Sequence, residues 1–193
     1  MKNINTMPIL KKENDIFPPE LLDDDALLAD PEKCWWCIYT MSRREKELMR
    51  QLENRQIAFY GPVVAKRYRS HSGRLRTSFI PLFTNYVFLF GSEDDRRSAL
   101  TSNCISKCTE VKDGRRLVAD LRQIKSILDA EVPVTAEARL EPGNPVRVKN
   151  GPFLGYEGTV IRREGKTRLL LSIHFLEQGV SIELDEALLE PLS

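Results

Sequence analysis

The sequence lacks any apolar run close to the roughly 20 residues that a membrane-spanning helix needs. Its first 20 residues also lack the long apolar core of a secretion signal, so we expect a cytoplasmic protein with no membrane contact. Histidine is scarce as well. The two histidines, His71 and His174, lie in different predicted domains, and no Ser/His/Asp order or pair of carboxylates on one face accompanies them. The sequence therefore predicts a binding protein without cofactor rather than an enzyme.

Cysteine is limited to four residues, at positions 34, 37, 104 and 108. A pair spaced as Cys34 and Cys37 raises the alternative of a zinc site. If residues 34–39 form a strand, however, side chains three apart point to opposite faces and cannot easily share one metal. No Gly or Pro lies near either pair to form the tight turns of a zinc ribbon. We interpret the cysteines as buried small hydrophobic residues and predict no metal site.

Net charge is only +1, but the charges are unevenly distributed. Residues 34–130 hold 18 basic and 10 acidic side chains, whereas residues 1–33 hold 4 and 8, and residues 131–193 hold 7 and 10. A basic middle between acidic ends favours contact of the middle segment with a polyanion. The acidic segment 1–33 contains four prolines, and we expect it to be mostly disordered.

Residues 34–130 alternate between strand-like and helix-like patterns. Strands are expected at 34–39, 57–68, 74–80, 85–90 and 105–111. A helix is expected from Ser42, whose hydroxyl would form a capping box with Glu45, and Leu48, Met49 and Leu52 would share its buried face. Two further helices are expected, one capped by Ser92 and one near the end of the segment. This alternation predicts an α/β sandwich with helices against a sheet.

From residue 131 the pattern changes. Residues 131–140 have a proline and no sustained period, so they are predicted to be a linker. Short β-type runs separated by turns then predict a small barrel over 141–193. Residues 169–175 and 180–184 are rich in strand formers, and Gly179 between them disfavours a long helix, so strands are expected in the intact protein.

Residues 141–160 resemble the KOW motif of NusG proteins and certain ribosomal proteins. The resemblance lies in glycines at barrel corners and in the apolar residues between them: Gly143, Val146, Val148, Gly151, Phe153, Gly155 and Gly158. It implies an SH3-like β-barrel KOW domain. The motif is typical of the family but does not specify one partner.

Residues 34–130 resemble the N-terminal (NGN) domain of NusG factors, through Trp35, Tyr39, the helix from Arg43, and the segment 81–88. The form Pro-Leu-Phe-x-Asn-Tyr is more similar to specialised paralogues of the RfaH kind than to the housekeeping factor. The resemblance implies a ferredoxin-like α/β sandwich, giving an α+β fold overall. It also implies an apolar patch that binds the clamp of the largest catalytic RNA polymerase subunit.

By this resemblance the polymerase-binding residues are Tyr39, Phe83, Tyr86 and Phe88. Phe88 is at least as well explained as a core residue, whereas a Tyr and a Phe beside Pro81 and Asn85 are expected to be exposed. Six basic residues are candidates for contact with non-template DNA or nascent RNA: Arg43, Arg50, Arg69, His71, Arg74 and Arg76. A solvated basic surface is an equally good interpretation of these six.

The function that follows is regulation of transcription elongation through RNA polymerase, as transcription antitermination. The KOW domain would contact a second partner, such as a ribosomal protein, Rho or nascent RNA. One alternative is a KOW-type RNA-binding or ribosome-associated protein without a polymerase role. A third hypothesis is a zinc- or thiol-dependent activity that uses the cysteines.

Overall fold

The computed structural model describes residues 12–69, 73, 75–130, 132–137, 143–163, 165–173, 176 and 178–192. The chain forms two compact units. The first runs to Leu21 and from Trp36 to Thr109, and the second comprises Leu22–Trp35 and the residues from Glu110 onward. Among the described residues, no helix has both the length and the apolar character to cross a membrane.

The first unit is built on a five-stranded sheet with the strand order β1-β3-β6-β2-β7. The strands are β1 (Ile16–Phe17), β2 (Cys34–Thr40), β3 (Ala58–Tyr60), β6 (Tyr86–Gly91) and β7 (Ile105–Glu110). β3 pairs antiparallel with both β1 and β6. Aromatic and branched residues dominate β2 and β6, as expected for strands that are largely buried.

Two helices supply the core of this unit, α2 (Glu45–Asn54) and α3 (Glu93–Leu100). The predicted apolar face of α2 is confirmed: Leu48, Met49 and Leu52 are all buried in one cluster with Ile38 and Phe59. Buried side chains from both helices and from β2, β3 and β6 meet in this cluster. The α/β sandwich expected from the sequence pattern is therefore present in the first unit.

The two helices differ in how they begin. At α3 the expected cap is confirmed: the Ser92 hydroxyl accepts from the backbone N–H of Asp95, and the Asp95 carboxylate accepts from that of Ser92. At α2 the expected capping box is wrong, because the helix begins at Glu45 and its N-cap is Arg44, which makes no side-chain cap hydrogen bond. The Glu45 carboxylate accepts instead from the backbone N–H of Asn85. A tertiary hydrogen bond has replaced the local one.

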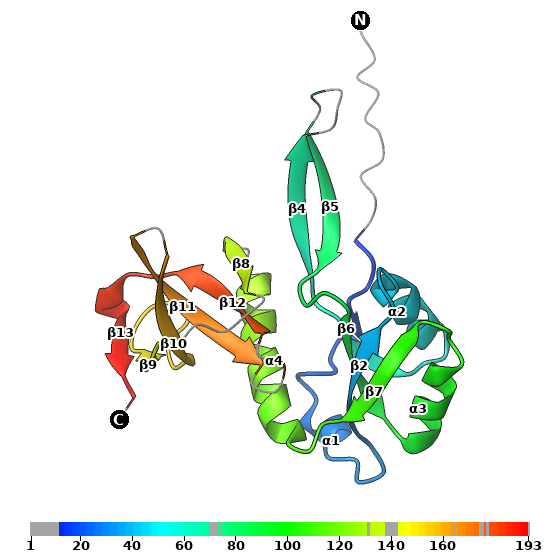
Figure 1. Ribbon diagram of the computed structural model, residues 1–193. Helices are drawn as coiled ribbons and strands as arrows, with labels where there is room; N and C mark the ends of the chain where they lie inside the picture. The colour runs from blue at the N-terminus through cyan, green and yellow to red at the C-terminus, as the bar shows by residue number, and fades with distance from the viewer. Residues whose placement is uncertain are drawn as a thin grey trace, which may run out of the picture. The chain divides into compact units, whose positions relative to one another are not determined.

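A hairpin of β4 (Val63–Arg69) and β5 (Leu75–Pro81) is the third element of the first unit. Its strands form a sheet of their own (Figure 1). Val63 lies opposite Pro81 and Arg69 opposite Leu75. The predicted hairpin is confirmed. Two predicted site residues between these strands, His71 and Arg74, lie outside the described residues.

The second unit contains α1 (Asp25–Leu28), α4 (Gly114–Asp129) and a six-stranded sheet. Val118, Leu121, Ile124 and Ile127 of α4 are buried. The strand order is β13-β9-β10-β11-β12-β8. The strands are β8 (Val134–Glu137), β9 (Asn144–Val148), β10 (Glu157–Arg163), β11 (Lys166–Ile173), β12 (Gln178–Glu183) and β13 (Leu189–Pro191), with a 3-10 helix at Glu186–Leu188.

Strand structure in the C-terminal part is confirmed, since the described residues from 143 to 192 form no α-helix. Closure of these strands into an SH3-like barrel remains a prediction. The expected linker 131–140 stays a prediction. Its residues Val134–Glu137 form β8, which pairs with β12 over Val134–Glu137 and Gly179–Ile182.

The expected disorder of residues 1–33 is wrong for residues 12–33. β1 forms an edge of the sheet by pairing with β3, and the backbone N–H of Gly61 donates to the Asp15 carbonyl at 2.7 Å. Leu21 and Leu22 are fully buried. Residues 1–11 lie outside the described residues, and the predicted domain boundaries at 34, 130 and 141 stay predictions.

Candidate functional site

Two tyrosines from neighbouring strands form an exposed aromatic pair. Tyr39 lies near the end of β2 and is 39% exposed, while Tyr86 begins β6 and is half-buried. Their ring centroids are 5.1 Å apart with an interplanar angle of 66°, an edge-to-face arrangement that is favourable for aromatic rings. We call Tyr39 and Tyr86 the tyrosine pair. Both belong to the predicted polymerase-binding set.

The other two predicted contact residues are buried. Phe83 is 2% exposed and Phe88 is 0% exposed. Their rings are arranged edge to face, with the ring centroids 6.2 Å apart. The expectation that Phe83 is exposed is therefore wrong. The segment before β6 is held by backbone hydrogen bonds, from Leu82 N–H to the Pro62 carbonyl and from Tyr86 N–H to the Phe83 carbonyl. This turn carries the Phe83 side chain into the interior.

Partial burial raises the pKa of the Tyr86 phenol, and the neighbouring Cys37 and Tyr39 raise it further. Tyr86 therefore stays neutral at physiological pH and keeps its O–H donor. The tyrosine pair presents apolar ring edges together with phenol groups. Such amphipathic groups are enriched at protein–protein interfaces.

Met41 is a surface residue that the sequence analysis did not single out. It follows β2, is 49% exposed, and its N–H donates to the Cys104 carbonyl at 2.8 Å. Side chains two apart on an extended chain point to the same side, so the position of Tyr39 was a signal that could have indicated Met41. Met41 adds a flexible apolar group near Tyr39.

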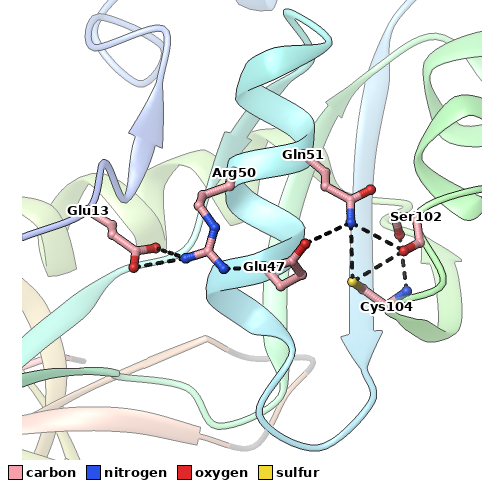
Figure 2. A network of polar contacts seen from close by, with 6 residues as sticks. All are labelled: Glu13, Glu47, Arg50, Gln51, Ser102 and Cys104. Carbon is pink, nitrogen blue, oxygen red and sulfur yellow. Dashed lines mark hydrogen bonds and ion pairs between the residues drawn. The ribbon is translucent and has the colours of Figure 1, made fainter.

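Arg50, on α2, is already paired with two carboxylates (Figure 2). Its Nη1 donates to both oxygens of Glu13 at 3.0 Å, and its Nη2 donates to Glu47 Oε2 at 2.5 Å. The contacts with Glu47 and Glu13 raise the pKa of Arg50, and the hydrogen bond with Glu47 has the larger effect. The same hydrogen bond lowers the pKa of the Glu47 carboxyl. Two neighbouring negative charges make Arg50 a poor candidate for a phosphate contact.

The same network continues through Gln51 to the loop after α3 (Figure 2). Gln51 Nε2 donates to Glu47 Oε1 at 3.1 Å and to the Ser102 carbonyl at 3.3 Å, and lies 3.8 Å from Cys104 Sγ. Ser102 Oγ in turn accepts from the backbone N–H of Cys104. These contacts join the N-terminal segment, α2 and the loop before β7.

The remaining basic candidates in the described part of the chain are exposed. Arg43 precedes α2 with a positive φ of 61°, and Arg69 and Arg76 lie on the β4–β5 hairpin. None of the three has an ion pair with another described residue. Lys66 and Arg67 on β4 are exposed in the same way, so positive charge accumulates on the hairpin.

The four cysteines are free thiols. Cys37 and Cys104 are buried, which confirms their interpretation as small core residues, while Cys34 and Cys108 are half-buried. Burial raises the pKa of the Cys37 thiol to about 12. In the described part of the chain, no three His, Cys, Asp or Glu side chains are grouped so that they could hold a metal ion.

The KOW-type residues form turns and buried positions of the second sheet. Gly151 and Gly155 have φ values of +88° and +86°, which L side chains rarely adopt. Gly158 and Gly143 lie against the carbonyl oxygens of neighbouring strands, where a Cβ would collide. The apolar members of the motif, Val146, Val148 and Phe153, are buried. In the adjoining turn Leu154 is 64% exposed.

Comparison with known proteins agrees with this geometry. A family model described as "Transcription termination factor nusG" matches residues 33–137, more than half of the chain. No curated protein matches the chain. One similar solved structure, "Crystal Structure of MjSpt4:Spt5 complex conformation B", is 19% identical, with coverage of 82% of this chain and 97% of that chain and a TM-score of 0.24. The family assignment rests on the family model: this chain belongs to the NusG family of transcription factors.

Proposed function

We propose that this protein binds the clamp of the largest catalytic subunit of RNA polymerase through the tyrosine pair and acts as an antitermination factor. Factors of the NusG family bind RNA polymerase during elongation. The observation that carries the proposal is the exposed edge-to-face contact of Tyr39 and Tyr86 within the segment that the family model matches. Met41, two residues after Tyr39, is exposed as well, whereas Phe83 and Phe88 are buried.

The mechanism is a shift of population between states of the polymerase. A protein that binds the closed clamp more tightly than the open clamp stabilises the closed state by the difference between the two binding free energies. Paused and terminating complexes become less populated if they require clamp opening. The protein needs no catalytic group for this effect.

Exposed basic residues would contribute a second contact, with non-template DNA or nascent RNA. Arg43, Arg69 and Arg76 are suited to it because they are exposed and have no ion pair with another described residue. Arg50, paired with Glu13 and Glu47, is assigned a structural role instead. The C-terminal sheet would bind a second partner such as a ribosomal protein, Rho or nascent RNA, with Leu154 as an exposed apolar contact.

The test is binding of the full-length protein to purified core RNA polymerase without nucleic acid. Truncation of an aromatic anchor in an interface typically costs about 2 kcal/mol or more, or roughly thirtyfold in affinity. We expect the double variant Tyr39→Ala/Tyr86→Ala to lose binding by at least that factor. Tyr68→Ala is the matched control, because Tyr68 is an equally exposed tyrosine on the hairpin of the same unit. Equal binding by the folded double variant and the parent protein would contradict the proposal.

A further inference from the structure

Glu45 is the only buried charged side chain among the described residues of the first unit. It is 5% exposed at the first position of α2. Its Oε1 accepts from the backbone N–H of Asn85 at 2.7 Å. A carboxyl group buried at this depth loses its hydration, so it needs a specific hydrogen-bond partner in the protein. That partner lies in the turn that leads into the tyrosine pair.

Asn85 has an unusual backbone conformation for a residue other than glycine, with φ at +66°. Left-handed conformations of this kind cost roughly 1 kcal/mol and persist only where the surroundings hold them. Here the Glu45 carboxylate accepts from the N–H of Asn85. The carbonyl of Asn85 accepts from the N–H of Thr40 at 2.8 Å. The Asn85 side chain donates to Tyr39 Oη at 3.4 Å.

Asn85 is therefore connected to both members of the tyrosine pair. It precedes Tyr86 in the chain, and it is hydrogen-bonded to Thr40, the residue after Tyr39. Without an acceptor at position 45, the N–H of Asn85 would be left unsatisfied and its left-handed conformation would lose one of its supports. The spacing of the two rings, which pairing of β2 and β6 also constrains, would then lose one of its supports.

We propose that Glu45 is a positioning residue for polymerase binding: its carboxylate oxygen locks Asn85 and thereby presets the tyrosine pair in the bound geometry. The inference rests on the proposed function of that pair. A preset surface gains affinity because less conformational freedom is lost on binding. Glu45 itself does not touch the polymerase.

Three substitutions separate this role from an ordinary helix-end charge. Glu45→Gln keeps an acceptor oxygen at the same reach without the charge, whereas Glu45→Asp keeps the charge but is one methylene shorter. An acidic residue that only stabilised the α2 N-terminus would tolerate Asp better than Gln. A positioning role predicts the reverse order, in which Gln is tolerated better than Asp. We expect Gln to bind core polymerase within about threefold of the parent protein, and Asp and Ala to bind about tenfold more weakly.

Glu53→Ala is the matched control on the same helix, because Glu53 accepts an exposed hydrogen bond from Asn14, which is far from the tyrosine pair in the sequence. We expect it to leave the affinity unchanged. A second readout needs no polymerase: amide hydrogen exchange of Asn85 and proton contacts between the Tyr39 and Tyr86 rings, both by NMR of the full-length protein. Ala and Asp should accelerate the exchange and weaken the ring contacts, and Gln should restore both.

The outcomes distinguish the two proposals. If the Tyr39→Ala/Tyr86→Ala variant loses binding but Glu45→Ala leaves Asn85 exchange and affinity unchanged, the role of Glu45 is overturned and the polymerase contact stands. An order in which Asp binds better than Gln overturns the role of Glu45 in the same way. If the double tyrosine variant binds like the parent protein, the polymerase contact itself is overturned, and the positioning role with it.

Discussion

Cys37 places a thiol in an environment that strongly disfavours its charged form. Burial raises the pKa of Cys37 from an ordinary value near 9 to about 12. At pH 8 the thiolate fraction is then about a thousandfold lower than in an unfolded chain. We expect Cys37 to resist iodoacetamide in the folded protein and to react once the chain is unfolded in guanidinium. Peptide mass spectrometry measures this, with half-buried Cys34 on the same strand as the internal comparison.

The pKa of Cys37 also has a consequence for stability. The pKa of Cys37 is higher in the folded protein than in the unfolded chain. The neutral thiol therefore makes its full contribution to the free energy of unfolding below about pH 9. It is lost as pH rises toward 12, since the unfolded state releases the proton first. Alkylation of Cys37 at equal rates in the folded and unfolded protein would contradict this account.

At the scale of single residues, the sequence allowed the tyrosine pair to be identified but not the burial of Phe83. Tyr39 and Tyr86 could be assigned from the resemblance to a family surface. Whether Phe83 points outward depends on backbone hydrogen bonds of Leu82 and Tyr86 with residues that local patterns do not specify. The role of Glu45 was missed for the same reason, because its partner lies 40 positions away.

Among the elements, the KOW-type strands depend on two glycines in different ways. A Cβ at Gly158 would lie 2.5 Å from the carbonyl oxygen of Leu170 on the paired strand β11, so backbone would have to move. At Gly151 nothing lies within 4 Å, and only the positive φ opposes a side chain. We expect Gly158→Ala to destabilise the protein by about 2–3 kcal/mol, and Gly151→Ala by about 1 kcal/mol.

Urea unfolding followed through the C-terminal part measures this difference. Gly73→Ala in the first unit is a suitable comparison, because Gly73 also combines a positive φ with open space. Equal losses for Gly158→Ala and Gly151→Ala would contradict the close approach of β10 and β11 at Gly158.

Element types were largely predictable from the sequence, whereas some element limits were not. The periodic apolar residues of α2 and α4 and the continuous apolar runs of β6 and β11 indicate their structure locally. The start of α2 was placed wrongly because Glu45 bonds to a distant turn. β1 and β8 were missed because both are short, and each is stabilised by pairing with a strand far away in the sequence.

Across the whole molecule, the uneven charge distribution gives an expectation for binding to an elongation complex. Each phosphate contact of a basic side chain changes the slope of log affinity against log salt concentration by about 0.7–0.9. We expect Arg69→Ala and Arg76→Ala each to reduce this slope by about that amount. Arg50→Ala should leave the slope unchanged, because Glu13 and Glu47 already neutralise Arg50.

Recruitment of full-length variants to a complex with nucleic acid, titrated over a range of salt concentrations, measures the slope. Binding to core polymerase alone is the control and should not depend on Arg69 or Arg76. The slope of log affinity against log salt concentration could fall with Arg50→Ala, or stay unchanged with Arg69→Ala and Arg76→Ala. Either result would show that the basic surface is solvated rather than bound to phosphate.

The β4–β5 hairpin has a further consequence, for the colloidal behaviour of the protein. Among the described residues its two strands pair only with each other, so each leaves one edge of unpaired backbone groups. Exposed edges of this kind invite pairing with a second copy and growth into aggregates, and natural proteins oppose this with charge. The hairpin carries such charge, and hairpins of different copies therefore repel one another. The charged residues are Lys66, Arg67, Arg69 and Arg76. The cations proposed to attract a nucleic acid also keep the free protein dispersed.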